Sequence, residues 1–361
     1  MRHARVLILL LALLVSPFPA ALAQSGTTGE PESARFDQLA RSFFEWRRVQ
    51  QPVSGDDIPR VERPDGWVPD WSPEAIEGYR AAYREYIRVL ERLDVEEWSV
   101  PRQVDARLLR AAMHRVPWEL DLLRAPHRNP LFYVQQTLGS VFELLLLSSP
   151  IDERRAENII LRFEQFPVTL KHARENLTEP VRPFAEATIE VLDGVDERLE
   201  QVETALDAHI PDKLKRRFHS SVSKASRSLE RYQKWLRSDL DEMRVSFAIG
   251  PDAYTWFLGN VALIPYTPNE LLAQGRQDWN RSVAWDVLEQ NRNRQQSELP
   301  LFRNMEQQIT VSDMKEKEIR AFLEAQDLMT VPDWLRHYRN RPLPPYLEPL
   351  AFMGVTDDLT S

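Results

Sequence analysis

The sequence predicts an all-α protein, with a body of many helices and one long antiparallel helical hairpin. Apolar residues recur at three- and four-residue steps through most of the chain, which is the period of an α-helix. Glycine is scarce, with 11 residues in 361, whereas a fold rich in strands needs glycine in its tight turns. Many of the 26 prolines stand at the start of a helical pattern, where the missing N–H costs no hydrogen bond.

The first 23 residues have the layout of a secretory signal peptide. Arg2 and Arg5 precede an apolar run over residues 6–15, and small residues follow up to Ala23. This three-part pattern is typical of a cleaved signal. The run is too short to span a bilayer, which takes about 20 apolar residues. We therefore expect cleavage between Ala23 and Gln24, and a periplasmic or secreted protein without a stable membrane anchor.

The mature chain is expected to begin with a flexible leader, residues 24–34, which is polar and aperiodic. One helical domain follows over residues 35–361, because no clear linker divides it. The chain has no cysteine, which excludes disulfides, thiolate metal sites and a cysteine nucleophile. Its formal net charge of −9 disfavours a nucleic acid as partner.

Two helices are predicted in the first half of the domain. One starts at Ser72-Pro73 and continues to Leu93, with apolar residues at helical spacing. Another starts at Asn129-Pro130, with residues 132–147 as its body. The stretch from Val53 to Trp71 reads as a long irregular loop, and loops of that length in compact domains are often functional.

A helical hairpin is predicted over residues 184–240. Two apolar series with alternating three- and four-residue steps flank a short turn that contains Pro211. Such a pattern gives two antiparallel helices with a narrow apolar seam, which protrude or pack along one side of the body. The series are Leu192, Val195, Leu199, Val202 and Leu206, and then Leu214, Phe218, Val222, Ala225, Leu229, Tyr232 and Leu236.

A further helix is predicted to start at a capping box, Thr267-Pro268-Asn269-Glu270. Threonine and glutamate at this spacing satisfy each other's backbone N–H groups, and proline suits the first helical position. Gly275 lies on the apolar side of this helix and permits close approach of another backbone. The apolar residues of that face are Leu272, Trp279, Val283 and Val287.

No set of residues predicts a catalytic, cofactor-binding or metal-binding site. Zinc hydrolases usually place two histidines four residues apart on one helical face, with a glutamate between them as the base. None of the seven histidines has a partner at that spacing. The nearest pairs are His172 with Glu175 and Asp333 with His337, and neither supplies the three ligands that a catalytic zinc needs.

Three other patterns have ordinary structural readings. Ser221-Val-Ser-Lys224 matches the Ser-x-x-Lys of penicillin-binding enzymes, but the companion elements of those enzymes are missing. The basic cluster Lys213–Arg217 could bind an anionic partner, but the negative overall charge favours a solvated helix face. The stretch Arg341–Leu347 resembles a proline-rich ligand, and we expect a rigid connector over the helical body instead.

Several blocks of the sequence resemble, in the family's order, the N-terminal part of a bacterial family called domain of unknown function 885. Four residues match recurring positions of that family, namely Gly250, Tyr254, Gly275 and Arg281, whereas Asp278 stands where glutamate is expected. The blocks are residues 127–147, 162–177 and 247–281, together with the C-terminal stretch from residue 330.

The resemblance implies a mostly helical, zincin-like fold and a metal-dependent peptidase activity. The family's metal motif is His-Glu-x-x-Pro-Gly-His, which in relatives follows a stretch like residues 342–361. This sequence has no His-Glu dipeptide and reaches only Ser361. We therefore expect a chain cut off before the metal motif, with no family ligand to carry over and with zinc bound only if the C-terminal half were present.

Three hypotheses for function remain open. The chain could be the N-terminal portion of an exported zinc hydrolase, forming one wall of a cleft for a peptide substrate. It could instead be a stand-alone periplasmic helical binding or interaction module, with the hairpin 184–240 as its contact surface, or a fragment with no function of its own. If half of a domain is missing, exposed apolar residues should promote self-association. Candidates for that surface are Trp256, Phe257, Trp279 and Trp285.

Overall fold

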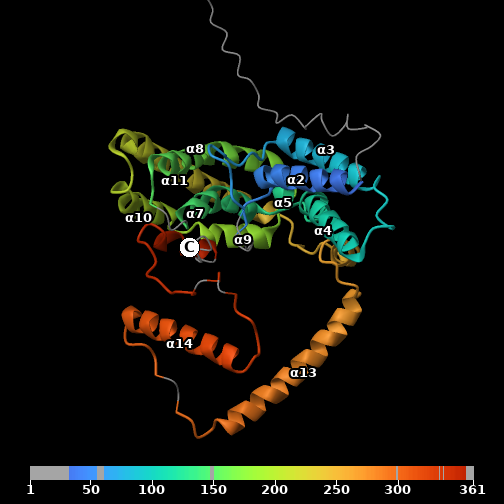
Figure 1. Cartoon of the computed structure of the whole chain (residues 1–361). Helices are drawn as coiled ribbons and strands as arrows, with labels where there is room; N and C mark the ends of the chain where they lie inside the picture. The colour runs from blue at the N-terminus through green and yellow to red at the C-terminus, as the bar shows by residue number, and fades with distance from the viewer. Residues whose placement is uncertain are drawn as a thin grey trace, which may run out of the picture.

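The computed structural model is a helical assembly, and the prediction of an all-α fold is confirmed (Figure 1). The structure describes residues 32–54, 61–146, 150–297, 300–332, 334–335 and 337–354. The predicted signal peptide and most of the predicted leader lie outside these ranges. Within them no strand forms, and an isolated β-bridge joins Val181 to Arg244. No helix in the described ranges is both long and apolar enough to cross a membrane.

The helices follow one another with short connections. The first half contains α2 (Glu32–Gln50), α3 (Pro73–Leu90), α4 (Val100–Pro117), α5 (Ala125–Arg128), α6 (Pro130–Val134), α7 (Ser140–Leu145) and α8 (Glu153–Asn176), with π-helical turns η1 (Trp118–Leu122) and η2 (Gln135–Gly139). The second half contains α9 (Arg182–Val191), α10 (Val195–Asp207), α11 (Asp212–Asp239), α12 (Pro251–Asn260), α13 (Pro268–Arg292) and α14 (Met305–Ala325), with 3₁₀ turns η3 (Leu240–Glu242) and η4 (Glu348–Met353).

The predicted helix starts are confirmed by their caps. The Ser72 hydroxyl accepts a hydrogen bond from the N–H of Ala75 at 3.2 Å, and α3 begins at Pro73. The capping box of α13 is complete, because Thr267 and Glu270 bond each other's backbone N–H groups. The predicted helix after Asn129 is interrupted by η2, a π-helical turn from which Gln136 reaches the segment at Val53.

The predicted hairpin is correct at its turn, but its first arm is not one long helix. α10 and α11 run antiparallel and bury the predicted seam residues between them. The helix before α10 is separate, because Gly194 takes a left-handed conformation with φ of 66° and ends the run from α9. α11 packs along α8, so the hairpin lies on the body rather than protruding from it.

The core has two parts that meet at the side chains of Trp46 and Tyr83. The larger part lies between the helices α6, α7, α8, α10 and α11, and its centre contains Phe163, Phe166 and Phe218. The smaller part joins α2, α3 and α4. Its buried members are Phe36, Leu39, Phe43, Tyr86, Leu90, Ala106, Leu109 and Met113.

The chain leaves this body after α12 and returns to it at η4 (Figure 1). Neither α13 nor α14 has a buried residue. The returning segment ends in the core, where Leu347, Leu350 and Met353 are 2%, 0% and 4% exposed. η4 contacts α10 and η2 there. We call residues 261–342 the excursion.

Candidate functional site

The histidines nearest to a metal-ligand spacing do not form a metal site among the described residues. No group of three or more His, Cys, Asp or Glu side chains there is placed to hold an ion. His172 is half-buried on α8, and its Nδ1 makes no hydrogen bond. Its suggested partner, Glu175, instead pairs with Lys171 at 3.3 Å on the exposed side of the helix. The residues of this chain therefore do not fit zinc at that position.

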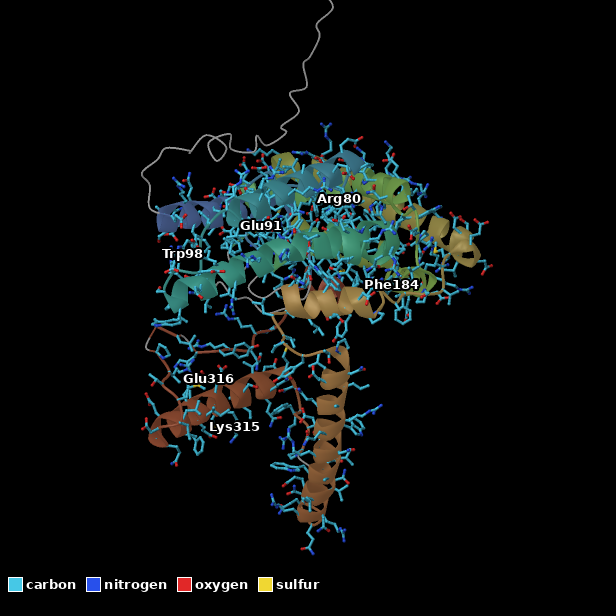
Figure 2. All side chains as sticks on the ribbon, turned by 90° about the vertical axis from the view of Figure 1, so that its right-hand side faces the viewer. Arg80, Glu91, Trp98, Phe184, Lys315 and Glu316 are labelled. Carbon is cyan, nitrogen blue, oxygen red and sulfur yellow. The ribbon has the colours of Figure 1, made fainter. Side chains whose placement is uncertain are left out.

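Of the second suggested pair, only His337 lies within the described residues. Asp333 lies outside the described residues, and the Nδ1 of His337 is 2.6 Å from a carboxylate oxygen of Glu316 on α14. The other oxygen of Glu316 accepts a hydrogen bond from the Nε of Arg320. These residues border a shallow hollow of about 410 Å³, lined by Ser312, Lys315, Glu316, Ile319, Arg320, Tyr338 and Asn340. Figure 2 shows Lys315 and Glu316 on α14, away from the body.

Glu316 is poorly suited to act as a general base. Burial raises its pKa, but hydrogen bonds from His337 and Arg320 outweigh that effect and leave the pKa below its usual value. A general base works best with a pKa near the working pH, and this carboxylate is shifted the other way. In this hollow the Glu316 carboxylate is therefore held in its charged form by His337 and Arg320.

The Ser-x-x-Lys pattern on α11 has no catalytic geometry. Ser221 is 1% exposed, and its hydroxyl donates to the carbonyl of Phe218 at 2.7 Å. Lys224 lies on the exposed side of the same helix. A nucleophilic serine needs a base within hydrogen-bond reach and access to substrate, and Ser221 has neither. Its hydroxyl satisfies the helix backbone instead.

The basic cluster Lys213–Arg217 is neutralised by neighbouring helices. Lys213 pairs with Glu153 at 2.6 Å and Arg217 with Glu164 at 2.5 Å, both on α8. Lys215 pairs with Asp207 at 3.1 Å across the hairpin turn. These pairs bind α11 to its neighbours, as expected for a solvated helix face rather than a site for an anionic partner.

The described parts of the predicted loop at 53–71 are held to the core; residues 55–60 lie outside the described ranges. The side chain of Gln136 binds both ends of the loop. It accepts hydrogen bonds from the N–H of Val53 and the indole of Trp71, and it donates to the carbonyl of Val53, at 2.9, 3.1 and 3.1 Å. The described parts of the loop therefore have a structural role.

A buried charge cluster beneath this loop was missed from the sequence. The guanidinium groups of Arg63 and Arg162 lie 4.3 and 4.9 Å from the ring centre of Trp67. The carboxylate of Glu143 lies 4.0 Å from Arg63 and 3.5 Å from Arg162. Burial lowers the pKa of Arg162 to about 10, although Glu143 opposes the change. Charged residues on helices are usually exposed, so the pattern alone gave no signal.

α12, which lies within the family-like block 247–281, packs against the body. Trp256 packs edge-on against His114, with ring centres 5.5 Å apart, and Phe257 packs on Trp118 at 4.5 Å. The hydroxyl of Tyr83 is 3.2 Å from Nδ1 of His114. Burial lowers the pKa of His114, and the charge of Arg110 adds to the shift. The expectation that Trp256 and Phe257 lie on an uncovered face is therefore wrong, because the body half-covers both.

The tryptophans of α13 behave as expected for an uncovered face. Trp279 is 71% exposed and Trp285 is 66% exposed. Together with α12 and the connector before it, α13 forms an edge of the molecule that contains the third family-like block, residues 247–281. Arg128, from the first block, donates to the carbonyl of Phe247 at 3.2 Å in the third block. This edge is the best candidate for a functional surface, although it contains no catalytic cluster.

The chain is similar to a family of bacterial proteins and to a solved structure. The family described as "Bacterial protein of unknown function (DUF885)" matches residues 53–308. The chain belongs to this family, and the match includes the blocks at 127–147, 162–177 and 247–281 but not the C-terminal stretch from residue 330. The match ends soon after the start of α14, so the hollow beside Glu316 lies beyond it.

One solved structure, that of a candidate lipoprotein of unknown function from Shewanella oneidensis, is also similar. The TM-score is 0.59 at 15% identity, and the match covers 84% of this chain and 59% of that one. At this identity the likeness shows the fold alone. The chain therefore spans 59% of the length of this relative. No curated protein matches the chain.

Proposed function

We propose that this protein is the N-terminal helical portion of an exported, zinc-dependent hydrolase of the DUF885 family, with peptides as its substrate class. The observation that carries the proposal is the family match over residues 53–308 in a chain that spans only 59% of a structural relative. The chemistry is assigned to the remainder of the family domain, because the described residues here do not fit a zinc site.

In this proposal the present chain supplies a wall of the cleft. The edge formed by α12 and α13 is the part of the wall that faces the remainder. The body fixes this edge through the aromatic contacts of Trp256 and Phe257. Zinc-bound water and a general base would come from the remainder, and no residue of this chain is assigned to either role.

The test is to measure metal and activity on the purified chain. We expect substoichiometric zinc after dialysis and no chelator-sensitive cleavage of a peptide library, because a catalytic zinc needs three protein ligands. One zinc per chain, with turnover that a chelator abolishes and metal restores, would overturn the assignment. His172, Glu175 and His337 would then be the first residues to substitute.

A second measurement tests whether a segment with the zinc motif gives the chain the proposed activity. The coding sequence downstream of Ser361 is read in all frames for His-Glu-x-x-Pro-Gly-His, and any such segment is expressed together with the chain. Zinc binding and peptide hydrolysis by the combined protein would support the proposal. A combined protein that binds zinc but hydrolyses no peptide would reject peptides as the substrate class.

The alternative of a stand-alone binding module draws little support from the hairpin 184–240. α11 packs along α8, and its basic residues at 213, 215 and 217 already pair with acidic neighbours. The apolar seam of the hairpin is buried within the body.

A further inference from the structure

The helix α13 has apolar side chains on two opposite sides. Its first face consists of Leu272, Trp279, Val283 and Val287, which are 53%, 71%, 47% and 58% exposed. Its second face is centred on Trp285 and Leu288, which are 66% and 63% exposed. Because successive residues turn by about 100°, Trp279 and Leu288 point about 180° apart. Figure 2 shows the side chains of this helix standing out on both sides.

Two strips separate these faces, and the strip that contains Asn280 is small or polar. The charges on the helix are largely paired within it, Arg281 with Asp278 at 2.8 Å and Arg292 with Glu289 at 2.5 Å. A helix with a single apolar stripe packs that stripe against one neighbouring element. α13 instead has two apolar faces separated by strips that carry its charged and polar residues, so elements on opposite sides could pack against it.

Three occupants could cover the two faces. The body of this chain does not, because α13 has no buried residue and its contact with the rest of the protein is through α12. A second copy related by a two-fold axis would bring one surface to one face and leave the opposite face exposed. A further segment of a longer chain can supply elements on both sides, and the Shewanella protein, which shares this fold, has 41% of its length outside the match.

We propose that α13 is the central helix of an interface, and that the C-terminal remainder of a DUF885 chain packs against both of its faces. The inference rests on the proposed function only in requiring that remainder, and it requires neither zinc nor hydrolysis. The excursion is suited to this role because both of its ends are fixed. α12 anchors one end through Trp256 and Phe257, and η4 anchors the other through the buried Leu350 and Met353.

The absence of cysteine from the chain allows each side of α13 to be probed by a single introduced thiol. Val283→Cys reports on the first face, Leu288→Cys on the second, and Asn280→Cys on the polar strip between them as the matched control. All three positions are exposed on the same helix, so none of the substitutions should unfold the protein, and circular dichroism checks this. The readout is the rate of reaction with a maleimide.

In the purified chain at low concentration we expect the three thiols to react at the same rate. As the concentration rises, association should protect both faces together and should give a range of sizes in sedimentation. A discrete dimer that protects one face alone would overturn the proposal in favour of a second copy. Protection of both faces at every concentration would overturn it in favour of the body of this chain.

The second part of the experiment uses the longer Shewanella protein. Cysteines are placed at the three structurally equivalent positions, in a background without other accessible cysteines. Both faces should react at least about tenfold more slowly than the control strip, because buried sites react only through local opening. Equal rates at all three positions would overturn the proposal. These maleimide reaction rates do not depend on whether the protein hydrolyses peptides. The packing proposal and the proposed function can therefore fail separately.

Discussion

Replacing Glu143 with glutamine should cost the protein a large part of its stability. The carboxylate of Glu143 lies 3.5 Å from Arg162 and 4.0 Å from Arg63. The side chains of the two arginines are 3% and 2% exposed, and that of Glu143 is 10% exposed. Without the carboxylate, two guanidinium groups would share a buried site around Trp67. The pKa of Arg162 is already lowered to about 10 by burial, and a group with that pKa still carries its charge at neutral pH.

Breaking a buried ion pair by removing one partner typically costs about 3–5 kcal/mol, because the other charge stays buried without compensation. Domains have a total free energy of unfolding of roughly 5–15 kcal/mol. We therefore expect Glu143→Gln to lose at least about a fifth of the stability. With an unfolding entropy of about 2.1 cal/mol/K per residue, a loss of about 3–5 kcal/mol in a domain of this size corresponds to a fall in Tm of roughly 4–8 °C.

Urea unfolding followed by circular dichroism measures this loss. Glu175→Gln is the control, because its pair with Lys171 joins side chains that are 43% and 72% exposed, and exposed pairs contribute about 0–1 kcal/mol. The double variant Glu143→Met with Arg162→Met should be less damaging than Glu143→Gln, since it removes both charges. A Glu143→Gln protein within about 1 kcal/mol of the parent would refute the reasoning.

Three further outcomes are expected. Protein recovered from the cell envelope should begin at or near Gln24, and a cytoplasmic protein that keeps Met1 would contradict export. Because burial lowers the pKa of His114, the unfolded chain binds a proton more readily than the folded chain, so stability should fall as the pH drops below about 6.5. His114→Gln should flatten urea midpoints measured between about pH 5.5 and 7.5, and an unchanged slope would exclude His114 as the cause. The purified chain should bind a hydrophobic dye, and Trp279→Ser combined with Trp285→Ser should reduce that binding; negligible dye binding by the parent chain would point to a self-sufficient module.

The sequence was most informative where local rules decide the structure. Helical periodicity, proline at the first helical position and the box at Thr267 and Glu270 each depend on residues within one or two turns of one another. These predictions agree with the starts of α3 and α13. The seam of the hairpin was also readable, because a sustained three- and four-residue pattern fixes which face of a helix is buried.

The sequence was least informative where distant residues meet. The contacts of Glu143 with Arg162 and with Arg63 join a loop to two helices, and no local pattern marks a charged residue as buried. The covering of Trp256 by His114 likewise depends on how α12 lies on α4. The break before α10 could have been read from Asp193-Gly194, since glycine is the usual residue for a left-handed helix end.

The body and the excursion differ in how much of their apolar side-chain surface is buried. In the body, the apolar faces of the helices are buried against one another, and even the returning η4 contributes Leu350 and Met353 to the core. In the excursion, α13 and α14 have no buried residue. Because the body is already packed, a rearrangement on binding would gain it little free energy. Any partner of α13 therefore meets a preformed edge. The free energy of that encounter then comes mainly from covering the two tryptophan faces, and the ordering cost falls on the excursion and its partner rather than on the body.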